Sequence, residues 1–135
     1  MQHDTTQLQI HLSFNGNCKE AMNFYAFCFG GKLSLLPIEQ SPMSAQWPQN
    51  MQHLILHASL QHANFTLLGS DVGGAHVKTG GPISIALICE TDKDLELYFE
   101  SLSIKGSVTH QPHKFFDGTI AALVDQYGIN WILKR

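Results

Sequence analysis

The chain has 135 residues, of which 44% are hydrophobic and 14% are charged, so it has the size of one ordinary domain and enough apolar residues for a core. This composition excludes an intrinsically disordered protein. The 8 Lys and Arg residues stand against 11 Asp and Glu residues, which gives a formal net charge of -3. Because the basic residues are few and scattered, we expect no nucleic-acid partner.

The sequence also lacks the patterns of a membrane or exported protein. No apolar run reaches the roughly 18 residues of a membrane span, and the polar N-terminal residues include no basic stretch before an apolar one. We therefore expect a cytoplasmic protein with no membrane partner. The three cysteines fit neither a disulfide framework nor a CxxC site. Cys28 and Cys89 are predicted core residues, and Cys18 is a predicted polar turn residue.

The first half of the chain predicts one strand, one helix and three further strands. Apolar and polar residues alternate over 8–14, which is the period of a half-buried strand. Asn17 and Glu20 resemble a capping box at the start of a helix. The apolar stripe of this helix comprises Ala21, Phe24, Tyr25 and Cys28, and Gly30 and Gly31 end it. Three strand-like segments follow, at residues 31–37, 54–60 and 65–68.

The second half repeats this plan. The four apolar helix positions recur 74 residues later, as Leu95, Tyr98, Phe99 and Leu102. A predicted strand over 83–89 precedes this second helix, and predicted strands over 106–109, 119–124 and 130–133 follow it. Two βαβββ modules, joined by a glycine-rich linker over residues 72–81, explain the repetition.

Residues 37–51 do not fit the repeat. This segment contains Pro37, Pro42 and Pro48, which are too many prolines for a central strand, and it is longer than most connections. Such a loop is either a lid over a binding site or a plain surface loop with Trp47 packed on the domain or on a second subunit. The sequence leaves both interpretations open.

Several stretches resemble PhnB-like proteins. Residues 11–25, HLSFNGNCKEAMNFY, and the FGG at 29–31 resemble the opening of these proteins, and FFDG at 115–118 and DQYGINW at 125–131 resemble their end. PhnB-like proteins belong to the vicinal oxygen chelate superfamily, also called the glyoxalase, bleomycin resistance and dioxygenase superfamily. The resemblance implies an α+β fold in which two βαβββ modules form an open barrel around a pocket. It also implies one domain over 1–135, with modules at 7–71 and 82–134, and a homodimer.

In such a barrel, alternate residues of each strand face the helix or the pocket. The helix-facing set would be Leu8, Ile10, Leu12 and Phe14 in the first strand and Leu54, Leu56 and Leu60 in the third, whereas His53 and Ile55 would point into the pocket. The predicted ligand-binding residues are Gln9, His11, Ser13, His57 and Ser59, together with Trp47 of the proline-rich segment and Phe115 near the last hairpin. The remaining histidines, His3, His62, His76, His110 and His113, are predicted in loops or termini.

Superfamily enzymes usually bind a divalent metal through His, Gln or Glu residues on the first and last strands of each module. Here these positions fall on Gln9, on or near Leu67, on Ile83 or Ser84, and on Ile132. Aliphatic side chains have no lone pairs to donate to a metal. The sequence therefore predicts no metal and no other cofactor, although Gln9, His11 and His57 leave a rearranged metal site as an alternative.

Other catalytic chemistries have little support in the sequence. No glycine-rich turn follows a strand in the manner of a doubly wound methyltransferase, and no GxSxG nucleophile motif occurs. Cys18 lies where a helix dipole could activate a thiol, but a turn role suits it as well, and Asp125 suits a β-turn better than a catalytic base. The favoured function is binding of a small organic molecule without metal, and no catalytic residue is assigned. The alternatives are a metal-dependent lyase, isomerase or dioxygenase-like enzyme, and a dimer whose pocket has no function.

Overall fold

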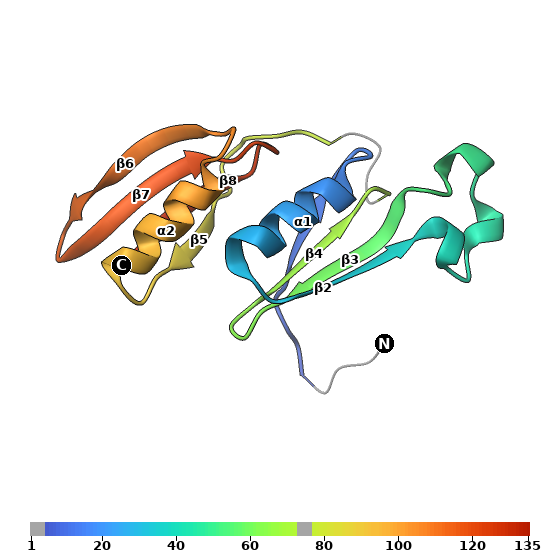
Figure 1. Ribbon diagram of the computed structural model, residues 1–135, viewed down its shortest axis with the longest axis horizontal. Helices are drawn as coiled ribbons and strands as arrows, with labels where there is room; N and C mark the ends of the chain where they lie inside the picture. Colours follow the sequence, from blue (N-terminus) through green and yellow to red (C-terminus); the bar gives the residue numbers. More distant parts are fainter. Residues whose placement is uncertain (1–4, 73–76) are drawn as a thin grey trace. The chain divides into compact units, whose positions relative to one another are not determined.

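The computed structural model describes residues 5–72 and 77–135, which form two compact units, one ending at Val77 and the other beginning at Lys78 (Figure 1). This boundary lies inside the predicted linker, whose residues 73–76 lie outside the described residues. Each unit is a βαβββ module, which confirms the predicted α+β fold with two modules. The joint open barrel stays a prediction. No helix in the described ranges is long and apolar enough to cross a membrane.

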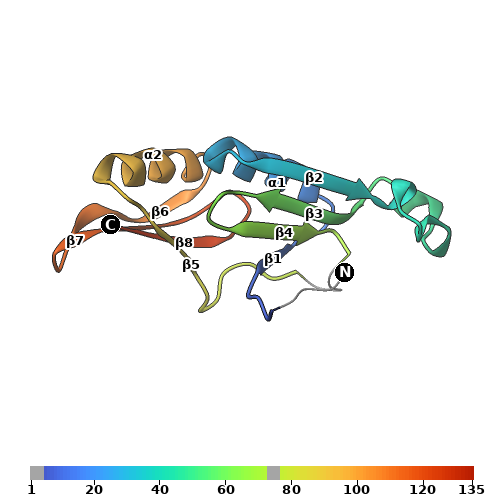
Figure 2. The ribbon, with the colours of Figure 1, turned by 90° about the horizontal axis from the view of Figure 1, so that it is seen from below.

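The first unit contains a four-stranded mixed sheet with one helix on its face (Figure 2). Its elements are β1 (Ile10–Ser13), α1 (Cys18–Phe29), β2 (Lys32–Pro37), β3 (Ile55–Gln61) and β4 (Thr66–Ser70). The strand order is β1-β4-β3-β2, with β1 parallel to β4 and the other pairs antiparallel. Three 3-10 helices, Ile38–Gln40, Ser44–Gln46 and Gln49–Met51, occupy the proline-rich segment between β2 and β3.

The second unit repeats the topology. Its elements are β5 (Ile85–Ile88), α2 (Asp92–Leu102), β6 (Ser107–Phe115), β7 (Gly118–Val124) and β8 (Asn130–Lys134), in the sheet order β5-β8-β7-β6. Strand β6 runs well past the predicted 106–109, through Pro112. Because β6 is an edge strand with two register shifts against β7, a residue without an N–H fits there.

Three of the four predicted stripe positions are buried in both helices, and the remaining position, Phe24 and Tyr98, is half-buried in both. Ala21 and Leu95 are fully buried, and Tyr25 and Phe99, which are 0% and 9% exposed, lie one turn further on. Both helices pack on the strands of their own sheet, so each module has its own apolar layer. The internal repeat therefore reflects two copies of the same helix-on-sheet core.

One face assignment made from strand alternation is wrong, and the first strand starts later than predicted. Leu8 is 99% exposed because it lies before β1, which begins at Ile10. Ile10 is 38% exposed at the strand end, although it pairs with buried Leu67 and shares a face with buried Leu12. In β3, Ile55 is 3% exposed and Leu56 is only half-buried, so their predicted faces are reversed. A β-bulge opposite Leu36 and Pro37 adds a residue to β3 and shifts the alternation.

Asp71 joins helix α1 to the sheet. Its Oδ1 accepts the backbone N–H groups of Gly16, at 2.9 Å, and Cys18, at 3.0 Å, and its Oδ2 accepts that of Ile55 at 2.9 Å. Asn17 makes no side-chain cap, so the predicted capping box is wrong and a residue from the end of β4 takes its place. Cys18 is fully buried, which corrects its prediction as a polar turn residue.

The proline-rich segment is held by specific contacts. Ile38 and Ser41 are buried, and the Gln52 amide donates to the carbonyl oxygens of Ser44, at 2.8 Å, and Trp47, at 3.0 Å. These bonds tie the end of the segment back to its middle. They give the segment an internal structure of its own, whichever of the two predicted roles it has.

Candidate functional site

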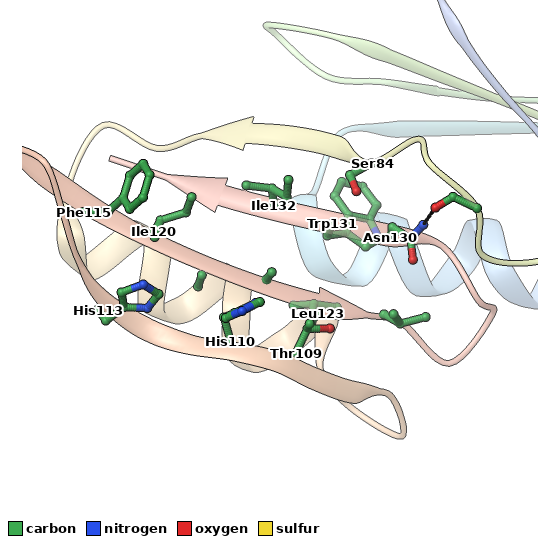
Figure 3. A pocket seen from close by; sticks show the side chains of 14 residues that line it. Ser84, Thr109, His110, His113, Phe115, Ile120, Leu123, Asn130, Trp131 and Ile132 are labelled. Atoms are coloured by element: carbon green, nitrogen blue, oxygen red, sulfur yellow. Dashed lines mark hydrogen bonds between the residues drawn. The ribbon is translucent and has the colours of Figure 1, made fainter.

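A cavity of about 500 Å³ lies over the sheet of the second unit (Figure 3). Its described lining comes from β6, β7, β8 and the segment before β5. The lining residues are Gly81, Ser84, Thr109, His110, His113, Phe115, Ile120, Ala121, Ala122, Leu123, Val124, Asn130, Trp131 and Ile132. All of them belong to one unit, so the cavity is a property of this module alone.

Strand alternation produces the apolar floor of the cavity. Ala121 and Leu123 are buried on the side of α2, whereas Ile120, Ala122 and Val124 are half-buried and lie on the opposite side of β7. Ala122 is paired with Ile132 of β8, so these two side chains lie next to each other on the floor. Within this module, the sheet therefore has a helix-packed core on one side and an apolar surface on the side opposite α2.

The irregular course of β6 places two imidazoles at one wall. Between His110 and His113 the strand has one residue more than β7, so both side chains face the cavity although they are three positions apart. Their ring centroids are 6.3 Å apart. The Nδ1 atom of His113 lies 2.8 Å from the carbonyl oxygen of Gln111, which orients this ring.

Asn130 fixes the other wall. Its Nδ2 donates to the carbonyl oxygens of Gly81, at 3.3 Å, and Ile83, at 3.0 Å, and this ties the segment before β5 to the start of β8. Ser84 follows directly and lines the cavity. Figure 3 shows Asn130 and Ser84 at the same end of the cavity.

Asp125 holds the β7–β8 turn and the ring of Trp131 next to the cavity. Its Oδ1 accepts the backbone N–H groups of Tyr127, at 2.8 Å, and Ile129, at 3.1 Å, and its Oδ2 accepts Nε1 of Trp131 at 2.9 Å. Asp125 is 3% exposed. These contacts confirm that it shapes the β7–β8 turn and leave it no free oxygen directed at a substrate.

One of the predicted ligand-binding residues, Phe115, lines this cavity. Gln9, His11, Ser13, His57 and Ser59 belong to the first unit. There His11, Leu68 and Ser59 form one row across β1, β4 and β3, on the sheet face opposite the buried Leu12 and Ala58. The five polar residues therefore lie on the side of the first sheet opposite α1 or precede the sheet, and whether they contact a ligand stays a prediction.

Trp47 lies in the segment between β2 and β3, next to a 3-10 helix. Its indole Nε1 is buried and has no hydrogen-bond partner among the described residues. The structure thus gives no contact that assigns Trp47 to a ligand, and its role stays a prediction.

Most of the residues that line the cavity were not predicted as ligand-binding residues from the sequence. His110 and His113 were expected in a loop because Pro112 hid the strand, and residues 120–124 of β7 are all apolar, so no alternation distinguished the face of β7 that lines the cavity. His62 lies in the β3–β4 turn as predicted. His3 and His76 lie outside the described residues.

The side chains at the metal positions of the superfamily do not fit a divalent metal. Leu67 is 2% exposed, and Ile132 presents an aliphatic side chain to the cavity. Ser84 lines the same cavity as Ile132, and a single hydroxyl is a weak ligand set. Across residues 5–72 and 77–135, no three His, Cys, Asp or Glu side chains form a group that could hold a metal ion.

Cys18 is buried next to a carboxylate, so we expect its thiol to be inert. Burial, and secondarily the negative charge of Asp71, raise the pKa of Cys18 to about 12. At pH 8 only about one thiol in ten thousand would be a thiolate, which is the reactive form. In the native protein, iodoacetamide followed by peptide mass spectrometry should leave Cys18 unlabelled, whereas urea-unfolded protein should be labelled. Rapid native labelling of Cys18 would contradict this environment.

The chain is similar to a known protein family and to proteins of known structure. A family model described as 3-demethylubiquinone-9 3-methyltransferase matches residues 6–134. The crystal structure of protein PA1353 from Pseudomonas aeruginosa is 31% identical, covers 94% of this chain and 96% of its own, and has a TM-score of 0.79. A PhnB protein from Bacillus cereus is 22% identical over 95% of this chain and 98% of its own, with a TM-score of 0.72. Protein YjdN from Escherichia coli is 25% identical over 93% of this chain and 92% of its own.

Proposed function

Since the chain belongs to the PhnB-like family described as 3-demethylubiquinone-9 3-methyltransferase, within the glyoxalase, bleomycin resistance and dioxygenase superfamily, we propose that it binds a small organic molecule in the cavity of its second module. The cavity is the observation that carries this proposal. Its volume of about 500 Å³ suits a small ligand, since such pockets measure roughly 300–1,000 Å³.

The chemistry of the lining supports binding of an organic molecule. Ile120, Ala122, Val124 and Ile132 provide an apolar floor, and Phe115 adds an aromatic ring at one end. Hydroxyl, imidazole and amide groups surround this floor. Pockets of this composition gain affinity from apolar contact and select orientation through a few polar groups.

The methyltransferase activity named in the family's description is not part of this proposal. S-adenosylmethionine is usually held by a doubly wound parallel sheet with a glycine-rich turn between a strand and a helix. Both described sheets are instead four-stranded and mixed, with a helix on one face. In α1, the residue before the helix is Asn17, not a glycine, and Asp71 accepts the N–H group of Cys18 at this end.

Two further proposals follow from likeness to the family. The polar sheet face of the first module opposite α1, with Gln9, His11, Ser13, His57 and Ser59, is proposed as a second ligand-contacting surface, to which Trp47 of the proline-rich segment is proposed to contribute. The protein is proposed to be a cytoplasmic homodimer. Light scattering in solution tests whether the protein is a dimer. The proposed surface predicts that His57→Ala weakens ligand binding and that a chelator does not change this binding, because no metal takes part.

The cavity proposal predicts that filling the floor abolishes binding. Ala122→Phe adds a ring where Ala122 faces the cavity, so a compound that stabilises the wild type should lose at least tenfold in affinity. Affinity is measured by calorimetry with compounds selected in a thermal-shift screen. The matched control is Ala63→Phe at the exposed β3–β4 turn. Ile120→Trp provides a second cavity variant, and equal binding by both cavity variants and the control would contradict the proposal.

A further inference from the structure

We propose that the cavity selects uncharged ligands that donate hydrogen bonds, such as phenols, over anions and over ligands of the same shape without a donor. This inference rests on the proposed function and names the ligand class for the same site. Some polar atoms of the lining already form hydrogen bonds within the module. The inference follows from the remaining polar atoms, which can bond to a ligand.

Asn130 offers an acceptor. The two partners of its amide, the backbone oxygens of Gly81 and Ile83, can only accept hydrogen bonds, so the side-chain nitrogen must face them. The carbonyl oxygen Oδ1 is therefore turned away from both partners. No donor from the described residues reaches it, and Figure 3 shows this side chain at the cavity wall.

His113 offers a second acceptor. The carbonyl oxygen of Gln111 accepts from Nδ1 at 2.8 Å, so Nδ1 carries the proton. In the neutral ring, Nε2 then has a lone pair and no proton. A ligand that meets this nitrogen must bring a donor of its own, as a hydroxyl does.

The cavity holds no fixed charge. Among its described lining residues, none carries a carboxylate, an ammonium or a guanidinium group. An anion would lose its hydration over the apolar floor of Ile120, Ala122 and Ile132, and only a proton taken up by His110 or His113 could give it a cationic partner. Ser84 and Thr109 contribute hydroxyl groups, which adapt to either a donor or an acceptor.

Three probes test this ligand class: 4-methylphenol, 4-fluorotoluene, which has nearly the same shape without a donor, and the 4-methylbenzoate anion. Dissociation constants are measured by NMR titration at pH 7 for the wild type and for His113→Phe, which keeps a ring at an exposed position and removes the acceptor. His62→Phe in the β3–β4 turn is the matched control. We expect the preference for the phenol over the fluoro compound to fall about two- to tenfold in His113→Phe and to stay unchanged in His62→Phe.

The possible failures are distinguishable. A wild type that binds the phenol no more tightly than the fluoro compound, or that binds the benzoate more tightly than the phenol, would overturn the ligand class while cavity binding stands. A phenol preference that is the same in wild type and His113→Phe would overturn the role of His113 as the acceptor. If no probe binds the wild type, or if every probe that binds also binds Ala122→Phe equally well, both the ligand class and the proposed function are contradicted.

Discussion

Asp71→Ala is expected to lower the free energy of unfolding by about 3–5 kcal/mol, because three backbone N–H groups lose a charged acceptor. Two of these donors precede or begin α1, and the third begins β3, so a single carboxylate holds the helix start against the sheet. The loss is a large part of the roughly 5–15 kcal/mol that stabilises a typical domain. Urea unfolding followed by circular dichroism measures it.

Asp71→Asn and Asp117→Ala separate this explanation from a general effect of removing an acid. Asparagine keeps one oxygen for Gly16 and Cys18 but turns its amide donor toward the N–H of Ile55, so we expect an intermediate loss. Asp117 is exposed in the β6–β7 turn, and its replacement should change stability by no more than about 0.5 kcal/mol. A loss below about 1 kcal/mol in Asp71→Ala would contradict the role assigned to this residue.

Asp125→Ala is expected to cost about 2–4 kcal/mol and to weaken ligand binding as well. Two backbone N–H groups of the β7–β8 turn and the indole of Trp131 lose their acceptor. Trp131 lies between Asn130 and Ile132, which line the cavity, so a shift of this ring is expected to displace the wall at Asn130 and the floor at Ile132. Urea unfolding gives the stability change, and calorimetry with a compound that binds the wild type gives the affinity change.

A double-mutant cycle isolates the contact between Asp125 and Trp131. Asp125→Asn can keep the turn bonds but directs an amide donor at the indole N–H, whereas Trp131→Phe removes that N–H. Asp125→Asn should therefore destabilise the Trp131→Phe protein less than the wild type, by about 0.5–3 kcal/mol. Additive effects of the two substitutions would mean that the indole bond contributes nothing.

Helices and their buried stripes were predictable because their period is local. Leu95 and Leu102 are 0% exposed, as their spacing required, and the repeat at 74 residues identified both modules before any contact was known. The resemblance in residues 11–25 led to the same fold, and the family match confirms it. These features depend on residues close together in the chain.

Features set by distant partners could not be predicted. Cys18 was expected in a polar turn because nothing near it shows that Asp71, 53 residues later, accepts its N–H group. The faces of Ile55 and Leu56 depend on a bulge against β2, and strand alternation carries no sign of an added residue. Both cases concern register and capping, which arise from pairing across the fold.

The candidate site shows the same limit more strongly. Phe115 was predicted from its position near the last hairpin, but His110 and His113 depend on two register shifts in an edge strand that a proline seemed to end. The acceptor character of Asn130 depends on two carbonyl groups almost 50 residues earlier in the chain, at separations of 49 and 47. Sequence spacing alone could not bring these atoms together.

The central claim is that the second module binds a small organic molecule in its own cavity, and amide NMR mapping of a 4-methylphenol titration tests it most directly. The account predicts saturable shifts concentrated at Ala122, Asn130 and Ile132, which line the cavity, and their loss in Ala122→Phe. Shifts that do not saturate, or that gather on the first module and persist in Ala122→Phe, would contradict it.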